Sequence, residues 1–284
     1  MEVRFLKDPG EFADTIASFL AGDPFTTSVL GTTLSLVISG EIVLDGDNLW
    51  IAAFGEDGAL AGAAMQTPPF NVFMPRLPGG VSSAVAAALA EMRRRIPGVN
   101  GETGSVREFL AAWRELTGED SVLKRAQRMY RLGQLSPPAN VPGSARLAAA
   151  GDIDLVHEWS VAFAAEAGAT HMPDLRADAV RKVSTGRIWL WTDESGLPVS
   201  LAGVSRPACG VARVAPVFTP AASRSHGYGS AVTARASKAA FEEGAEHVVL
   251  YTDLANPVSN SIYQRIGYVA DHDAEEHRVV AALS

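Results

Sequence analysis

Apolar and polar residues follow two distinct periods along the first half of the chain. Residues 48–54 and 59–66 are two apolar runs joined by the turn at 55–58, which predicts a β-hairpin. Residues 104–117 place apolar side chains at helical spacing and predict an amphipathic helix. Strands are also expected at 2–7, 71–74 and 122–132, and helices at 81–96 and from Asp8-Pro9 to about 21, while 26–39 fits either structure.

Residues 134–146 contain three prolines without hydrophobic periodicity, which predicts a linker between domains. We therefore expect domains at 1–133 and 146–284, with 134–145 joining them. Beyond this segment the order of elements restarts. The expected strands are 145–149, 188–192, 199–205, 214–218, 247–252 and a pair from 268 to about 281; the expected helices are 153–167, 178–185, 229–243 and 256–266.

The two halves share one order of elements, which indicates an internal duplication. Gly118 and Gly267 each follow a predicted helix and can be laid on one another. The first half then lacks the polar side chains of the second, and its loop at 77–80 lacks an arginine at the spacing found in the second. The positions set opposite one another are Arg107 and Asn256, and Arg114 and Tyr263.

Length, charge and cysteine content exclude several classes of protein. The chain has 284 residues, which suits two domains of about 140, each able to bury a core. A net charge of −8, from 24 basic and 32 acidic side chains, gives no field that favours nucleic acid or anionic lipid. The single cysteine, Cys209, forms no internal disulfide, and the first residues lack a signal-peptide pattern. We expect a cytoplasmic protein that binds neither nucleic acid nor membrane.

The stretch 214–230 reads as a buried strand, a short loop and the start of a helix. Gly227 and Gly229 let the backbone approach an anion closely, and the new helix adds partial positive charge at its N-terminus. Arg224 adds a full charge with a planar fork that suits phosphate. The stretch therefore predicts a phosphate cradle, although it carries no mononucleotide or dinucleotide fingerprint. The alternative is a tight strand-to-helix turn with a purely structural role.

Two motifs together resemble the GCN5-related N-acetyltransferase (GNAT) family. In that family a strand is followed by a six-residue motif with Gln or Arg at its first position, Gly at its fourth, and Gly or Ala at its sixth. The segment Arg224-Ser225-His226-Gly227-Tyr228-Gly229 matches this motif in full. Further on, the family tends to have an Asn seven residues before a Tyr, then Gly followed by an aromatic residue. Asn256, Tyr263, Gly267 and Tyr268 reproduce that order. The resemblance covers residues 145–284, and the first half resembles the family in element order alone.

The resemblance implies an α+β fold of two GNAT-like domains, each a mixed, mainly antiparallel sheet with a central parallel strand pair and flanking helices. It also implies acetyl-CoA as co-substrate, with its pyrophosphate on the glycine loop and its pantetheine arm in a split between strands 214–218 and 248–252. The amide near Val217 or Phe218 would hold the thioester oxygen, and Asn256 would either cap its helix or bond the cofactor. The expected binding residues are Val217, Phe218, Thr219, Arg224, Ser225, His226, Gly227, Tyr228, Gly229, Ser230, Thr252, Asn256 and Tyr263.

Tyr263 is the expected catalytic residue. Attack of an amine on the thioester expels a thiolate, to which a positioned tyrosine can donate a proton or a hydrogen bond. The alternative is a tyrosine that only packs on a helix face. The base that receives the amine's proton is left open among Glu158, Glu166, His171, Asp253 and a water chain, with Glu166 placed in the catalytic set because it lies near a helix end.

We therefore expect an acetyl-CoA-dependent N-acetyltransferase with one CoA site per chain and a small-molecule or peptide amine as acceptor. Two alternatives remain open: an acyl-CoA-binding sensor, and a transferase that takes an aminoacyl group from tRNA, against which the acidic balance argues. An acidic surface modestly favours a cationic acceptor. His272 and His277 lack a third ligand nearby, so no metal is expected. The chain can be a monomer or a homodimer.

Overall fold

The computed structural model describes residues 1–44, 46–168 and 174–281, without the side chains of 257–259. Clustering of contacts divides the chain into two compact units. Unit 1 comprises Met1–Arg128, Asp253–Ala255 and the C-terminal segment from His272, and unit 2 comprises Met129–Thr252 and Asn256–Asp271. The contiguous boundaries expected from the sequence, 1–133 and 146–284, stay a prediction; the units assign the end of the chain to unit 1.

Unit 1 is a mixed sheet with strand order β1-β2-β3-β4-β5-β12-β6. The parallel pair is β4 with β5, where Val72 pairs with Val99 and Met74 with Gly101. Its strands are β1 (Glu2–Leu6), β2 (Leu49–Phe54), β3 (Leu60–Gln66), β4 (Val72–Met74), β5 (Gly98–Glu102), β6 (Asp120–Leu132) and β12 (Tyr268–Val280). Its helices are α1 (Pro9–Thr15), α2 (Ala17–Gly22), α3 (Ser28–Ile38), α4 (Val81–Glu91) and α5 (Thr103–Thr117).

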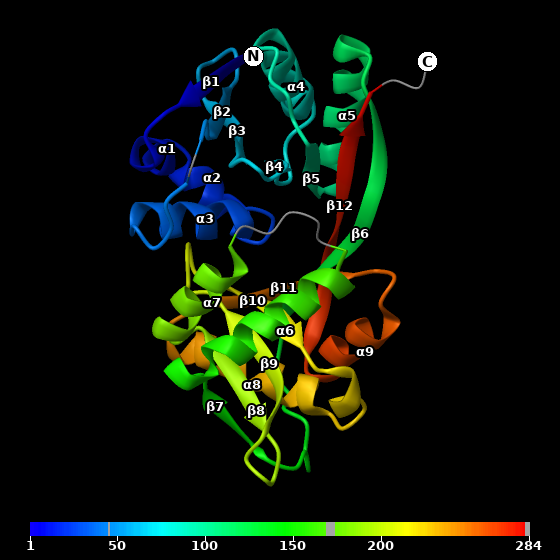
Figure 1. The fold of residues 1–284 in the computed structure, drawn as a ribbon. Coiled ribbons are helices and arrows are strands. Elements are labelled where there is room, and N and C mark those ends of the chain that lie inside the picture. The colour runs from blue at the N-terminus through cyan, green and yellow to red at the C-terminus, as the bar shows by residue number, and fades with distance from the viewer. Residues whose placement is uncertain (45, 169–173, 282–284) are drawn as a thin grey trace. The chain divides into compact units, whose positions relative to one another are not determined.

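Alternation along the strands gives unit 1 a core on each face of its sheet. Leu49 and Ile51 of β2 pack with α4 and α5, which lie side by side (Figure 1). Trp50 and Ala52, which alternate with Leu49 and Ile51 along β2, pack with α1, α2 and α3 on the opposite face. The hydrophobic pattern of β2 therefore fixes which helices cover which face.

Unit 2 repeats this plan with strand order β12-β6-β11-β10-β9-β8-β7, and its parallel pair is β10 with β11. In unit 1 the strand beside β5 is β12, which ends the chain, whereas in unit 2 the strand beside β11 is β6. The further elements are β7 (Ser144–Leu147), α6 (Ile153–Glu166), α7 (Leu175–Ser184), β8 (Ile188–Thr192), β9 (Pro198–Val204), β10 (Val211–Phe218), α8 (Tyr228–Glu242), β11 (His247–Asp253) and α9 (Pro257–Arg265).

The cores of unit 2 also lie on both faces of its sheet. Ala212 and Val214 of β10 pack with α8 and α9 on one face. Phe218, at the end of the same strand, packs with Trp159 of α6 and with α7 on the other. The mixed, mainly antiparallel sheets with one parallel pair in each half confirm the expected fold class.

Two expectations about elements were wrong, and one strand was not expected. The expected strand pair after residue 268 is one strand of 13 residues, β12, whose second half pairs antiparallel with β5. The expected helix up to residue 21 is broken at Ile16 into α1 and α2. Strand β5 was missed, because its sequence, GVNGE, has two glycines and little apolar character. The cap at Asp8 is confirmed, since its side chain accepts a bond from the Glu11 amide.

No helix among the described residues has the length and the apolar character that crossing a membrane requires.

Candidate functional site

The parallel strands β10 and β11 separate part-way along their length. They pair at Val211 with His247, Ala212 with Val248, and Arg213 with Val249, but not beyond, although β10 continues to Phe218 and β11 to Asp253. The residues after Arg213 and Val249 therefore line a gap within the sheet, which we call the fork. Such a gap leaves strand backbone groups to bind an extended ligand that carries amides.

A β-bulge in β10 accompanies the fork. Val214 pairs with Val204 of β9 and Val217 with Ala202, so two residues of β10 oppose the single residue Gly203. A Cβ atom at Gly203 would lie 2.4 Å from the Ala215 carbonyl oxygen. Glycine is thus required at this position for the bulge to lie against β9, a signal that the sequence contains in Gly203 and Pro216.

Pairing beyond the bulge supports the expected oxyanion donor. Val217 pairs with Ala202 and Phe218 with Leu201, in antiparallel register. Successive residues of an antiparallel strand direct their backbone groups alternately toward and away from the partner. One of the amides of Val217 and Phe218 is therefore directed away from β9, toward the fork.

The loop after β10 prepares the N-terminus of α8 for an anion. Gly227 has φ +83° as the N-cap residue, and Ser225 before it has φ +67°. The first bond of α8 runs from the Ala231 amide to the Gly227 carbonyl. Among the described residues no acceptor contacts the amides of 225–230, so six successive donors are available at the positive end of a helix.

Close packing keeps this loop against the end of β10. A Cβ at Gly229 would lie 3.2 Å from Thr219 Oγ1. Thr219 Oγ1 in turn lies 2.8 Å from Ser200 Oγ, which also donates to the Phe218 carbonyl. His226 Nδ1 lies 2.7 Å from the Arg224 carbonyl oxygen, and its ring stacks on Tyr228. The structure therefore brings together the expected binding residues from Thr219 to Ser230.

Arg224 connects the loop to α6. Its Nε donates to the Thr219 carbonyl oxygen at 2.9 Å, and its Nη2 donates to Glu166 Oε1 at 2.6 Å. Both side chains are about half exposed. Glu166, which we expected in the catalytic set, is thus held by the arginine that we expected to bind phosphate, and its role as a base stays a prediction.

Tyr263 lies on α9 within the same core cluster as Val214 and Leu250, and Val217 packs against that cluster. The residue is 8% exposed, and burial raises the pKa of its phenol to about 12. Within the described part of the chain its hydroxyl has no hydrogen-bond partner. Its neighbour Tyr268 differs, because that hydroxyl lies 2.7 Å from Ser237 Oγ.

Asn256 stands directly before α9, where its carbonyl accepts bonds from the Asn260 amide at 3.2 Å and from Asn260 Nδ2 at 2.8 Å. These bonds place Asn256 at the N-cap position of α9. Thr252 is buried near the end of β11. Their contacts with CoA stay predictions.

Two of the remaining candidates for the base lie on described elements other than α9, and the third falls outside the described residues. Glu158 is exposed on α6. Asp253 is assigned to unit 1, and its carboxylate accepts the Ala255 amide at 2.7 Å ahead of α9. His171 falls outside the residues that the structure describes. No group of three His, Cys, Asp or Glu side chains suited to a metal occurs among the residues described.

The corresponding part of unit 1 is filled by its own side chains. Gly80, with φ +87°, is the N-cap of α4 as Gly227 is of α8. Glu108 Oε1, from α5, accepts the Gly80 amide at 2.9 Å, the Ser83 amide at 3.1 Å and the Ser83 hydroxyl at 3.0 Å. A carboxylate of the chain thus takes the place that an anionic ligand would occupy at this helix N-terminus.

Unit 1 also lacks the fork. Strand β4 ends at Met74, and Met74 is still paired with Gly101 of β5. A Cβ at Gly101 would lie 1.8 Å from the Met74 carbonyl oxygen, so the two strands are in very close contact. No gap for a pantetheine arm opens between β4 and β5.

The loop of unit 1 also contains an arginine, at a different spacing. Arg76 stands four residues before Gly80, the N-cap of α4, whereas Arg224 stands three residues before Gly227, the N-cap of α8. Arg76 Nη1 donates to Asp23 at 2.8 Å, as Arg224 Nη2 donates to Glu166. Both loops therefore contain an arginine paired with an acid, and the units differ in its spacing, in the helix N-terminus and in the strand pairing.

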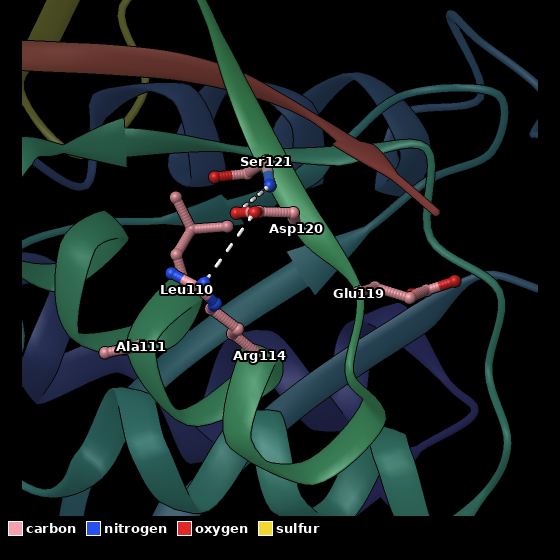
Figure 2. A pocket seen from close by; sticks show the side chains of 6 residues that line it. All are labelled: Leu110, Ala111, Arg114, Glu119, Asp120 and Ser121. Carbon is pink, nitrogen blue, oxygen red and sulfur yellow. Dashed lines mark hydrogen bonds and ion pairs between the residues drawn. The ribbon is translucent and has the colours of Figure 1, made fainter. Parts of the chain in front are cut away.

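The positions that the duplication sets opposite Asn256 and Tyr263 carry ion pairs. Arg107 binds Glu275 of β12, with 2.6 Å between Arg107 Nη2 and Glu275 Oε1. Arg114 lines a pocket of about 170 Å³ between α5 and the start of β6, and lies 3.9 Å from Asp120 (Figure 2). Arg114 is largely exposed, so unit 1 has no buried phenol at this place.

The comparison with known families decides what this arrangement represents. Residues 153–268 match the model of the acetyltransferase (GNAT) family. The chain carries a GNAT acetyltransferase domain. The match includes the fork, the loop and α9 of unit 2, so the GNAT domain contains every element of the site described above. No curated protein matches the chain significantly.

Solved structures extend the likeness in fold to the whole chain. A protein from Drosophila has a TM-score of 0.68 at 12% identity, covering 99% of each chain. A tandem GNAT protein from the clavulanic acid biosynthesis pathway has a TM-score of 0.57 at 11% identity, covering 100% of this chain and 99% of its own. A GCN5-related N-acetyltransferase from Sphaerobacter thermophilus has a TM-score of 0.56 at 15% identity, covering 98% and 94%. The whole chain, unit 1 included, thus shares the fold of these structures.

Replacing Glu108 tests whether the stability of unit 1 depends on the carboxylate at the start of α4. We expect Glu108→Ala to lower the free energy of unfolding by about 1–2 kcal/mol, because three donors at the start of α4 lose their acceptor. Glu115→Ala, on the exposed face of α5, is the matched control and should change stability by less than about 0.5 kcal/mol. Equal unfolding curves for the two variants in urea would contradict the role of Glu108.

Proposed function

We propose that the chain is an acetyl-CoA-dependent N-acetyltransferase in which unit 2 binds acetyl-CoA and acetylates an amine. The observation that carries the proposal is the combination, in unit 2, of the fork beyond Arg213 and six amides without an acceptor at the start of α8. CoA has both a pyrophosphate, which the loop would bind, and an extended pantetheine arm, which would lie in the fork.

The loop residues would bind the pyrophosphate. The amides of 225–230 would donate to its oxygens, and the guanidinium of Arg224 would add charge-assisted bonds. Because Arg224 already pairs with Glu166, it would share its donors between the carboxylate and the phosphate. The amides therefore supply most of the binding.

The fork would hold the pantetheine arm and the thioester. An amine would attack the carbonyl carbon of the thioester, and the amide near Val217 or Phe218 would stabilise the oxyanion. As the C–S bond breaks, the electron pair goes to sulfur, and the Tyr263 phenol donates a proton to the thiolate and regains one from solvent. The proton lost by the amine passes to water or to a base that we do not assign.

Binding of CoA to the intact chain tests the proposal. We expect calorimetric titration with CoA or acetyl-CoA to give one equivalent per chain, because Glu108 and the closed β4–β5 pair leave no second cradle. Release of free thiol from acetyl-CoA should then depend on an added amine. No binding of any CoA ester, or two equivalents per chain, would overturn the proposal.

The two loop arginines offer a matched pair for this titration. Arg224→Ala should weaken CoA binding about tenfold, as expected for a charge-assisted bond to phosphate at a half-exposed position. Arg76→Ala makes the same change in the loop of unit 1 and should leave the dissociation constant unchanged.

A further inference from the structure

Arg213 lies at the closed end of the fork, and one nitrogen of its guanidinium has no hydrogen-bond acceptor among the described residues. Its Nη1 is inaccessible to solvent and makes no hydrogen bond, and within the described residues its guanidinium has no ion pair. Its backbone is bonded to one residue: the Arg213 amide donates to Ser205 Oγ at 2.9 Å, and the Arg213 carbonyl oxygen accepts the Ser205 amide at 2.9 Å. A buried guanidinium nitrogen without an acceptor is unfavourable, which indicates that another molecule completes its bonding.

Strand alternation places this guanidinium on the face opposite α8. Ala212 and Val214 of β10, and Val248 and Leu250 of β11, belong to the core beneath α8 and α9. Arg213 and Tyr251 therefore lie on the other face of the sheet. Burial lowers the pKa of Arg213, while the nearby Tyr251 acts in the opposite direction, which agrees with this placement.

The phosphates of CoA are too far away to be the missing partner. The phosphate loop begins after Phe218, five residues beyond Arg213, which corresponds to roughly 16 Å of extended strand. Arg213 instead belongs to the last paired position before the strands separate. The thioester would lie nearer than the phosphates, at Val217, four residues or at most roughly 13 Å along β10 from Arg213. The arginine side chain and an extended acceptor would span that distance together.

We propose that Arg213 binds a carboxylate on the acceptor, so that the substrate is an amino carboxylate: a molecule with an amine to be acetylated and a carboxylate held by the guanidinium. This inference rests on the proposed function and names the substrate class of the same site. A guanidinium presents a planar fork of donors that matches a carboxylate, and the contact would orient the amine toward the thioester. It replaces the expectation of a simple cationic acceptor drawn from the net charge.

The test compares amino carboxylates with their own carboxamides as acceptors. The panel would contain α-, β- and γ-amino acids, each paired with the carboxamide that keeps its length and amine, with thiol release as the measurement. We expect kcat/KM to be at least about tenfold higher for the carboxylate than for its carboxamide in at least one pair. In Arg213→Met this ratio should fall to about one, with the dissociation constant for CoA unchanged.

Lys238→Met is the matched control, since it removes an exposed cation from α8 of the same unit and should retain the ratio. If Arg213→Met does not fold, Arg213→Lys keeps the charge without the planar fork, and we expect it to retain part of the preference.

The outcomes separate this inference from the proposed function. Failure of the wild-type chain to bind CoA would remove both. If the chain binds CoA, three results would overturn the inference alone. They are equal use of carboxamides and carboxylates, no acetylation of any carboxylate in the panel, and the same carboxylate-to-carboxamide ratio in Arg213→Met as in wild type. Better turnover of an aminoalkyl phosphate than of any carboxylate would overturn the assignment of the anionic group.

Discussion

Tyr263→Phe should lower turnover about 100-fold while the dissociation constant for acetyl-CoA stays within about twofold of wild type. The hydroxyl is the only group that this change removes, and it has no hydrogen-bond partner among the described residues, so the folded state loses no hydrogen bond. What is lost is the proton donor for the departing thiolate. Steady-state kinetics and calorimetry on the same preparation measure the two quantities.

The pKa of Tyr263 adds a second expectation to the same experiment. Because burial raises this pKa to about 12, the phenol keeps its proton at every pH below that value and loses it only as the pH rises through it. Turnover of the wild-type chain should therefore show no decrease near pH 10, where an ordinary tyrosine ionises.

Tyr268→Phe is the matched control for Tyr263. It makes the same chemical change in the neighbouring ring, 6.1 Å away between centroids, but removes a bond to Ser237. We expect it to reduce the free energy of unfolding by about 1 kcal/mol and to leave turnover unchanged. Wild-type turnover in Tyr263→Phe, or an equal loss in both variants, would show that Tyr263 is not the donor.

Gly267→Ala should destabilise the chain by at least about 3 kcal/mol. Gly267 has φ +103°, and a Cβ there would lie 1.9 Å from the Gln134 carbonyl oxygen. The strained backbone costs roughly 1–2 kcal/mol, and relief of the overlap would break the bonds from the Gly133 and Ser136 amides to the carbonyls of Gly267 and Ile266. Urea unfolding measures the effect.

Gly118→Ala separates these two contributions. Gly118 ends α5 with φ +74°, at the position that the duplication sets opposite Gly267, but no atom lies within 4 Å of its Cβ position. We expect a loss of only about 1–2 kcal/mol from backbone strain. The same loss in both variants would mean that the segment after β6 does not constrain Gly267.

The periodic segments were predicted from sequence because their signals are local. Helix α5 has apolar residues at helical spacing, and α1 begins with Pro9 directly after the capping residue Asp8. Residues 26–39 were ambiguous because a continuous apolar, β-branched run suits a buried helix as well as a strand; packing against β2 and β3 makes it α3. Strand β5 forms through its partners β4 and β12 rather than through its own sequence.

Some features of the candidate site were likewise predicted from the sequence, and others were not. By itself the sequence predicted the glycine loop before α8, the tyrosine on a later helix and the repeated order of elements, because each depends on residues close together in the chain or on their spacing. Only the tertiary structure decided where β10 and β11 separate, that Glu108 fills the helix N-terminus of unit 1, and that Arg213 Nη1 has no acceptor among the described residues. These three features depend on contacts between segments distant in sequence, or on the lack of one, which no local pattern records.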